Sequence, residues 1–120
     1  MKKKTLVLGA STNPERYSFL AVERLTAHKH PVVAIGNKVG FIGNSEIITT
    51  HPQLENIDTV TIYLNTSHQK EYYNYIVSLH PKRIIFNPGS ENKELFDLAL
   101  VHNIQPIEAC TLVMLSTGQY

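Results

Sequence analysis

Small and polar residues that could bind a phosphate follow the first predicted strand. Leu6–Leu8 is a continuous apolar run, typical of a parallel strand that is covered on both faces. It leads directly into Gly9, Ala10, Ser11 and Thr12. Small residues let the backbone turn sharply, and a helix beginning near Tyr17 would point its N-terminal N–H groups at a ligand over this turn. The pattern predicts a nucleotide-type phosphate site, although it lacks the second and third glycines of G-x-G-x-x-G.

A cation follows the second predicted strand, Val32–Ile35, where the chain continues as Gly36, Asn37 and Lys38. NAD-binding domains usually carry Asp or Glu at this point, to accept hydrogen bonds from the ribose hydroxyls. Lys38 therefore favours a ligand with an additional phosphate near its adenosine, which NADP and coenzyme A both have. The alternative interpretation is a solvated loop lysine.

Two further predicted strands also end in polar or turn-forming residues. The run 58–64 is followed by Asn65 and Thr66, and the run 83–86 by Asn87, Pro88 and Gly89. In open α/β sheets, ligands bind beyond the carboxyl ends of the strands at the point where the strand order reverses. The agreement of several strand ends strengthens the prediction of a ligand site there.

The elements that position these residues alternate between strand and helix about five times. The first helix is expected over about 17–28, and a final turn of helix over 112–115. The resulting prediction is one domain over 1–120: an α/β, doubly wound, Rossmann-like fold with a mainly parallel five-stranded sheet between two helical layers.

The stretch 39–56 has no clear periodicity. Glu46–Thr49 is interpreted as a short edge strand or a helix turn, and Pro52 as the start of a short helix ending near Asn56. Thr66 with Gln69 three residues later predicts a capping box at the next helix.

Composition excludes several classes of protein. The net charge of +1 gives no broad basic field for nucleic acid, and no apolar stretch approaches the roughly 20 residues of a membrane span. One cysteine, Cys110, provides no disulfide framework, and the six histidines lack ligand spacing, so no metal site is predicted. No signal peptide is found, which leaves the cytoplasm as the expected location. The sequence shows no catalytic constellation, so the question of an enzyme stays open, with a binding role as the first hypothesis.

The ordered set of motifs resembles the small bacterial CoA-binding proteins of the Rossmann type, which are similar to the CoA-binding domain of the succinyl-CoA synthetase alpha subunit. The resemblance covers nearly the whole chain. It rests on Val7–Ser11, the segment Asn13-Pro14-x-Arg16-x-Ser18, the strand end with Lys38, Asp58, the turn Asn87–Gly89 and Cys110. This chain departs from the family's Val-Asn-Pro-Lys-like strand end, since it has Ile35-Gly36-Asn37-Lys38.

The resemblance implies bound coenzyme A or an acyl-CoA, in a carrier, sensor or regulator. The diphosphate would lie on Gly9–Thr12 and the first helix N-terminus, at which Arg16 stands. The phosphoadenosine would lie near Asn37 and Lys38, and the pantetheine arm would pass Asn65, Thr66 and Asn87–Gly89. Two other hypotheses stay open, an NADP-linked oxidoreductase subunit and a protein-interaction module with a vestigial nucleotide pocket.

Overall fold

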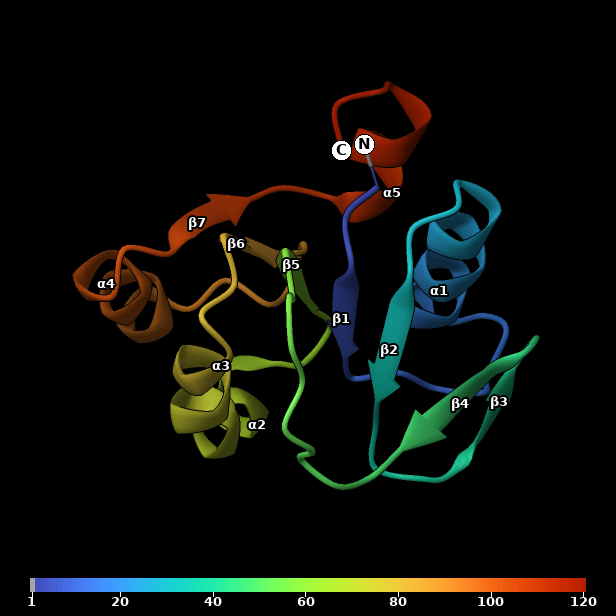
Figure 1. Ribbon diagram of the computed structural model, residues 1–120, viewed down its shortest axis with the longest axis horizontal. Coiled ribbons are helices and arrows are strands. Elements are labelled where there is room, and N and C mark those ends of the chain that lie inside the picture. Colours follow the sequence, from blue (N-terminus) through green and yellow to red (C-terminus); the bar gives the residue numbers. More distant parts are fainter. Residues whose placement is uncertain (1) are drawn as a thin grey trace.

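The computed structural model, which describes residues 2–120, contains one sheet with the strand order β3-β4-β2-β1-β5-β6-β7. Figure 1 shows β1 near the middle of the sheet. The strands are β1 (Thr5–Leu8), β2 (Val32–Ile35), β3 (Gly40–Ile42), β4 (Ser45–Ile48), β5 (Thr59–Ile62), β6 (Arg83–Phe86) and β7 (Gln105–Glu108). Every neighbouring pair is parallel except β3 and β4. The chain builds outward from β1 through β2 and then returns to the other side of β1 with β5, so the order reverses between β1 and β5.

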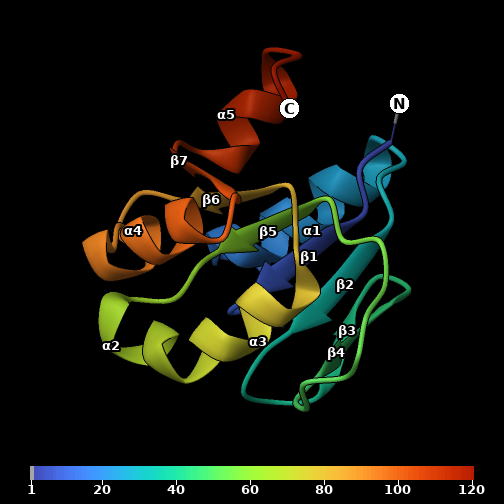
Figure 2. The same ribbon diagram turned by 60° about the vertical axis from the view of Figure 1, so that its left-hand side comes forward.

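Helices cover both faces of the sheet, as Figures 1 and 2 show from two sides. They are α1 (Tyr17–Ala27), α2 (Thr66–Gln69), the 3-10 turn η1 (Lys70–Tyr72), α3 (Tyr73–Leu79), α4 (Lys93–Val101) and α5 (Thr111–Ser116). Residues of α1 and α5 pack on one face and residues of α3 and α4 on the other. This confirms the three-layer, doubly wound architecture.

Two separate apolar cores explain why the first strand does not alternate in polarity. Leu6 and Leu8 belong to the core under α3 and α4, whereas Val7 belongs to the core under α1 and α5. All three side chains are fully buried. A strand whose two faces are both covered needs apolar residues at every position.

The predicted count of five strands is wrong because a hairpin extends the sheet. β3 and β4 pair antiparallel through the turn at Gly43 and Asn44, where Gly43 has a φ of +59°. β4 then pairs parallel with β2, so it lies inside the sheet and β3 forms the edge. The run 46–49 is therefore a strand, but not the edge strand that was expected. Its short apolar pattern could not reveal that the preceding segment, Gly40–Ile42, pairs with its outer side.

Two local predictions around this region are also wrong. No helix follows Pro52, because residues 51–58 form an irregular loop. The Tyr75 hydroxyl of α3 donates to the Pro52 carbonyl at 2.7 Å. The capping box does not form either. Asn65 is the N-cap of α2 and accepts from His68 N, while Thr66 Oγ1 donates to the Glu91 carbonyl.

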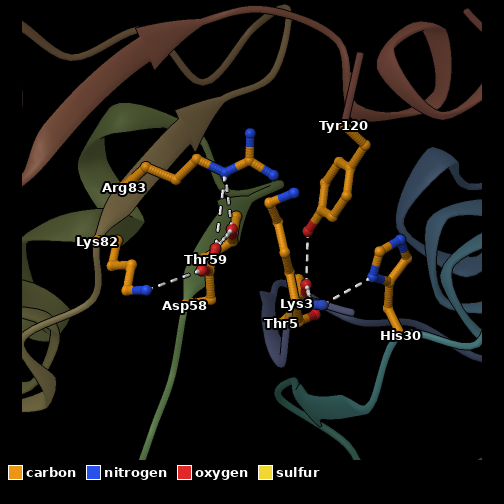
Figure 3. Close-up of polar contacts among 8 residues, drawn as sticks. All are labelled: Lys3, Thr5, His30, Asp58, Thr59, Lys82, Arg83 and Tyr120. Atoms are coloured by element: carbon orange, nitrogen blue, oxygen red, sulfur yellow. Dashed lines mark hydrogen bonds and ion pairs between the residues drawn. The ribbon is translucent and has the colours of Figure 1, made fainter. Parts of the chain in front are cut away.

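A polar network closes the amino end of the sheet (Figure 3). Arg83 Nε donates to Thr59 Oγ1 at 2.7 Å, and the Tyr120 ring lies 4.4 Å from the Arg83 guanidinium carbon. The Tyr120 hydroxyl also hydrogen-bonds Thr5 Oγ1. Tyr120, the last residue of the sequence, thus packs between the starts of β1 and β6.

His30 adds a titratable side chain to this end of the molecule. Its Nδ1 accepts from the Lys3 backbone N–H at 3.0 Å, and its ring packs edge-on against Tyr120. Burial, and after it the charges of Lys2 and Lys3, hold the His30 pKa below the usual 6.5. The neutral ring is favoured in the folded state, so its contribution to stability is complete above pH 6.5 and is lost as pH falls toward the lower folded pKa.

We therefore expect the melting temperature of the wild type to fall more between pH 7.5 and 5.5 than that of His30→Gln. Gln keeps a side-chain acceptor but cannot titrate. His102→Gln, at an exposed residue that ends α4, serves as the control and should keep the wild-type pH dependence. Equal acid sensitivity of His30→Gln and wild type would contradict this assignment.

Candidate functional site

A cleft of about 910 Å³ opens at the carboxyl ends of β1 and β5, where the strand order reverses. It is bounded by the turn after β1, the first turn of α1, the end of β2, and the loops that follow β5 and β6. Ligands in open α/β sheets bind at this place, and the volume is in the range of small-molecule sites.

The turn after β1 depends on Gly9. Its φ is +91°, and an added Cβ would stand 2.8 Å from the Tyr63 carbonyl oxygen. The N–H groups of Gly9 and Ala10 both donate to the Ile35 carbonyl, at 2.9 and 3.0 Å. These two amides are therefore engaged within the fold, and Gly9 serves to bring the ends of β1, β2 and β5 together.

The first turn of α1 faces the cleft through Arg16, Tyr17 and Ser18. Arg16 is the N-cap and, in the described part of the chain, makes no side-chain cap bond, so the first N–H groups of this 11-residue helix lack the usual side-chain acceptor. The preceding loop is ordered by its own side chains: Ser11 Oγ accepts from Asn13 N, and Asn13 Oδ1 accepts from Glu15 N. A helix N-terminus held in this way is a favourable place for an anion.

A buried amide network fixes the opposite wall of the cleft. Gln69, which is 1% exposed, donates to the carbonyls of Leu64 and Ser90, each at 2.8 Å. Its Oε1 accepts from Asn92 Nδ2 at 2.9 Å, and Asn92 also caps α4. Gln69 thus joins the loops after β5 and β6, a tertiary role that its spacing from Thr66 did not suggest.

Asn87 acts inside the protein. It is 2% exposed, its amide donates to Thr61 Oγ1 and to the Ile62 carbonyl, and its Oδ1 accepts from Thr111 N. These bonds tie the end of β6 to β5 and to the start of α5. The side chain therefore positions the Pro88-Gly89 turn and does not line the cleft.

The structure brings together most of the site residues predicted from the sequence. Those that line the cleft are Gly9, Ala10, Ser11, Arg16, Asn37, Asn65, Pro88 and Gly89, whereas Thr12, Lys38, Thr66 and Asn87 do not. Lys38 is exposed and adjoins the lining residue Asn37. Lining residues that were not predicted from the sequence include Glu15, Tyr63, His68, Glu71 and Tyr72. Tyr72 ends the 3-10 turn η1 and packs partly buried against the core under α3 and α4, so only the tertiary structure could place it at the cleft.

The cleft has a mixed electrostatic character. Arg16 contributes a cation and Glu15 and Glu71 contribute carboxylates. Burial raises the pKa of Tyr63 far above its ordinary value, and burial followed by the charge of Glu71 raises that of Tyr72. Both phenols stay neutral at physiological pH and provide rings rather than charges.

Residues 2–120 contain no group of three or more His, Cys, Asp or Glu side chains placed to hold a metal ion. In the same part of the chain no helix combines the length and apolarity of a membrane span.

Comparisons with known proteins agree with this architecture. A crystal structure of an uncharacterized protein is 48% identical and superposes with a TM-score of 0.98, covering 100% of this chain and 99% of that one. A hypothetical protein from Pyrococcus horikoshii (19% identity, TM-score 0.87, 97% and 83% covered) and a protein from Thermus thermophilus (15%, 0.85, 99% and 91%) share the fold. No curated protein matches the chain. The family model described as a CoA binding domain matches residues 3–116, and the chain therefore belongs to the CoA-binding domain family.

Proposed function

We propose that this protein binds coenzyme A or an acyl-CoA in the carboxyl-end cleft and acts as a carrier, sensor or regulator. The main support is the position of the first turn of α1, which lines a cleft at the switch point and has no side-chain cap within residues 2–120. The chain also belongs to the CoA-binding domain family. A diphosphate is the ligand group that suits such a helix N-terminus.

Because the backbone N–H groups of Gly9 and Ala10 already donate to the Ile35 carbonyl, other residues would have to hold the diphosphate. Within residues 2–120, neither Ser11 N nor Thr12 N donates to a backbone or side-chain acceptor. These amides, the first turn of α1 and Arg16 are therefore the proposed diphosphate site. Asn37 and Lys38 would hold the phosphoadenosine, and Asn65, Thr66 and the Pro88-Gly89 turn, positioned by Asn87, would border the pantetheine arm.

Titration calorimetry with coenzyme A, 3′-dephospho-coenzyme A, NADP and NAD tests this function. We expect coenzyme A to bind more tightly than NAD and NADP. Lys38→Ala should weaken coenzyme A about fivefold, because an exposed charge contact contributes up to about 1 kcal/mol. The same substitution should leave 3′-dephospho-coenzyme A unchanged, since that ligand lacks the phosphate which Lys38 would contact.

Lys93→Ala is the matched control, because Lys93 is exposed and pairs with Asp97 outside the cleft. It should change neither affinity. Tighter binding of NADP than of coenzyme A would favour the NADP-linked alternative, and no binding of any nucleotide would favour a protein-interaction module. If Lys38→Ala weakened the binding of both coenzyme A forms equally, Lys38 would not contact the adenosine phosphate.

A further inference from the structure

One wall of the carboxyl-end cleft is made by the loops that follow β5 and β6. The parallel ladder between these two strands ends at the pair Ile62 and Phe86. Residues of both loops farther along the chain line the cleft, among them Leu64 and Ser90. Because the ladder has ended before these residues, side chains must fix the spacing of this wall.

Two buried side-chain amides join the loops at successive distances from the sheet. Asn87 Nδ2 donates to the Ile62 carbonyl at 2.9 Å, at the ends of the strands. Farther along both loops, Gln69 Nε2 donates to the carbonyls of Leu64 and Ser90, each at 2.8 Å. Asn87 thus fixes where the loops begin, and Gln69 fixes their separation where they line the cleft.

The Gln69 amide is well held, because each of its polar atoms has a partner. The side chain is 1% exposed, and both of its N–H groups are used by the two loops. Its Oε1 accepts from Asn92 Nδ2, which also donates to the Tyr73 hydroxyl at 2.8 Å. A fully paired buried network is rigid. A further link between the loops, from Thr66 Oγ1 to the Glu91 carbonyl, is exposed, so water competes with it.

Gln69 also anchors the short helical segment that carries it. His68 precedes Gln69 in α2, and Glu71 and Tyr72 follow it in η1. These three neighbours line the cleft, whereas Gln69 is buried. An effect of Gln69 on a ligand would therefore act through the groups that it positions.

We propose that Gln69 is a positioning residue for the pantetheine arm of the ligand. The inference rests on the proposed function, in which coenzyme A lies in this cleft and its pantetheine arm passes the loops after β5 and β6. A flexible arm binds more tightly to a wall that already has its bound spacing, because only the arm then has to be ordered. The hydrogen bonds of the Gln69 amide all go to these two loops, so its loss should weaken the pantetheine half of the ligand and not the nucleotide half.

The test compares coenzyme A with adenosine 3′,5′-bisphosphate, which is coenzyme A without the phosphopantetheine. Titration calorimetry measures the affinity for coenzyme A, and competition against coenzyme A measures the weaker bisphosphate. Gln69→Met has nearly the same shape but no N–H donor. It should weaken coenzyme A about tenfold and leave the bisphosphate within about twofold of wild type.

Gln69→Glu is the second variant, and it decides the outcome if Gln69→Met does not fold. It keeps the side-chain length and an acceptor for Asn92, but it places a carboxylate oxygen where Nε2 donates to two carbonyls. The same selective loss of coenzyme A affinity is expected. Melting temperatures establish that each variant is folded under the conditions of the titration.

Thr59→Val is the matched control. Thr59 is fully buried, and its hydroxyl bonds Asp58 and Arg83 at the start of β5, at the other end of the sheet. The variant also loses buried hydrogen bonds and should be less stable, but it should keep wild-type affinity for both ligands.

Two results would overturn the inference alone: unchanged coenzyme A affinity in the folded Gln69 variants, or equal weakening of coenzyme A and the bisphosphate. Failure of the proposed function is distinguishable from both, because the wild type would then not bind coenzyme A, and the inference would be refuted together with the function.

Discussion

A Gly9→Ala variant is expected to lose about 2–4 kcal/mol of its free energy of unfolding, measured by urea denaturation at pH 7.5. Two costs combine in this estimate. A φ of +91° is unfavourable for a residue with a side chain, and the new Cβ would stand 2.8 Å from the backbone oxygen of Tyr63. The neighbouring atom is backbone at the end of β5, so relief of the contact requires β1 and β5 to separate locally.

Gly89→Ala is the matched control. Gly89 has the same φ of +91°, but within the described residues 2–120 no further atom lies within 4 Å of the position of its added Cβ. Its substitution should therefore cost only the conformational part, about 1 kcal/mol. Equal losses in the two variants would show that the close approach of Tyr63 contributes nothing, and that Gly9 matters only for its dihedral angle.

The second large effect is expected for Asn87→Ala, with a loss of about 3 kcal/mol in the free energy of unfolding. The substitution removes three hydrogen bonds and leaves the Ile62 carbonyl and the Thr111 N–H buried without their partner. Unpaired buried polar groups cost about 1–3 kcal/mol each, with some relief from local relaxation. Thr61 Oγ1 keeps its bond to Thr111 Oγ1, which limits the loss.

Asn65→Ala provides the comparison for this prediction. Asn65 is exposed, lines the cleft and caps α2 through one bond to His68 N, so its loss should cost about 1 kcal/mol. An Asn87→Ala protein within about 0.5 kcal/mol of wild type that binds coenzyme A poorly would contradict a structural role for Asn87. It would instead indicate that the side chain turns toward the ligand.

The sequence alone predicted those elements whose pattern lies within one short segment of the chain. The non-alternating run Leu6–Leu8 predicted a strand covered on both faces, and Leu6 and Val7 indeed enter different cores. In α1, Ser18, Ala21, Val22 and Leu25 stand at i, i+3, i+4 and i+7, the spacing of one helix face, and these four are its buried residues. Small residues after β1 predicted a sharp turn, and Gly9 in that turn has a φ of +91°.

Hydrogen-bonding partners from distant parts of the chain determine two features that the local sequence did not predict. The run 46–49 is equally compatible with an edge strand and a helix turn, because its strand character depends on hydrogen bonds to β2 and β3. Thr66 and Gln69 have the spacing of a capping box, yet Gln69 is drawn into the interior by the carbonyls of Leu64 and Ser90. A local motif is lost when buried backbone groups offer stronger partners.

For the candidate site, the sequence alone determined which turns meet at the carboxyl edge of the sheet. Parallel strands end at the same edge, and residues such as Ser11, Asn65 and Gly89 closely follow the ends of β1, β5 and β6. Only the tertiary structure decided which groups remain available there. The amides of Gly9 and Ala10 are engaged by Ile35, and the side chain of Asn87 by β5 and α5, since folding satisfies buried polar groups first with the partners that it brings nearest.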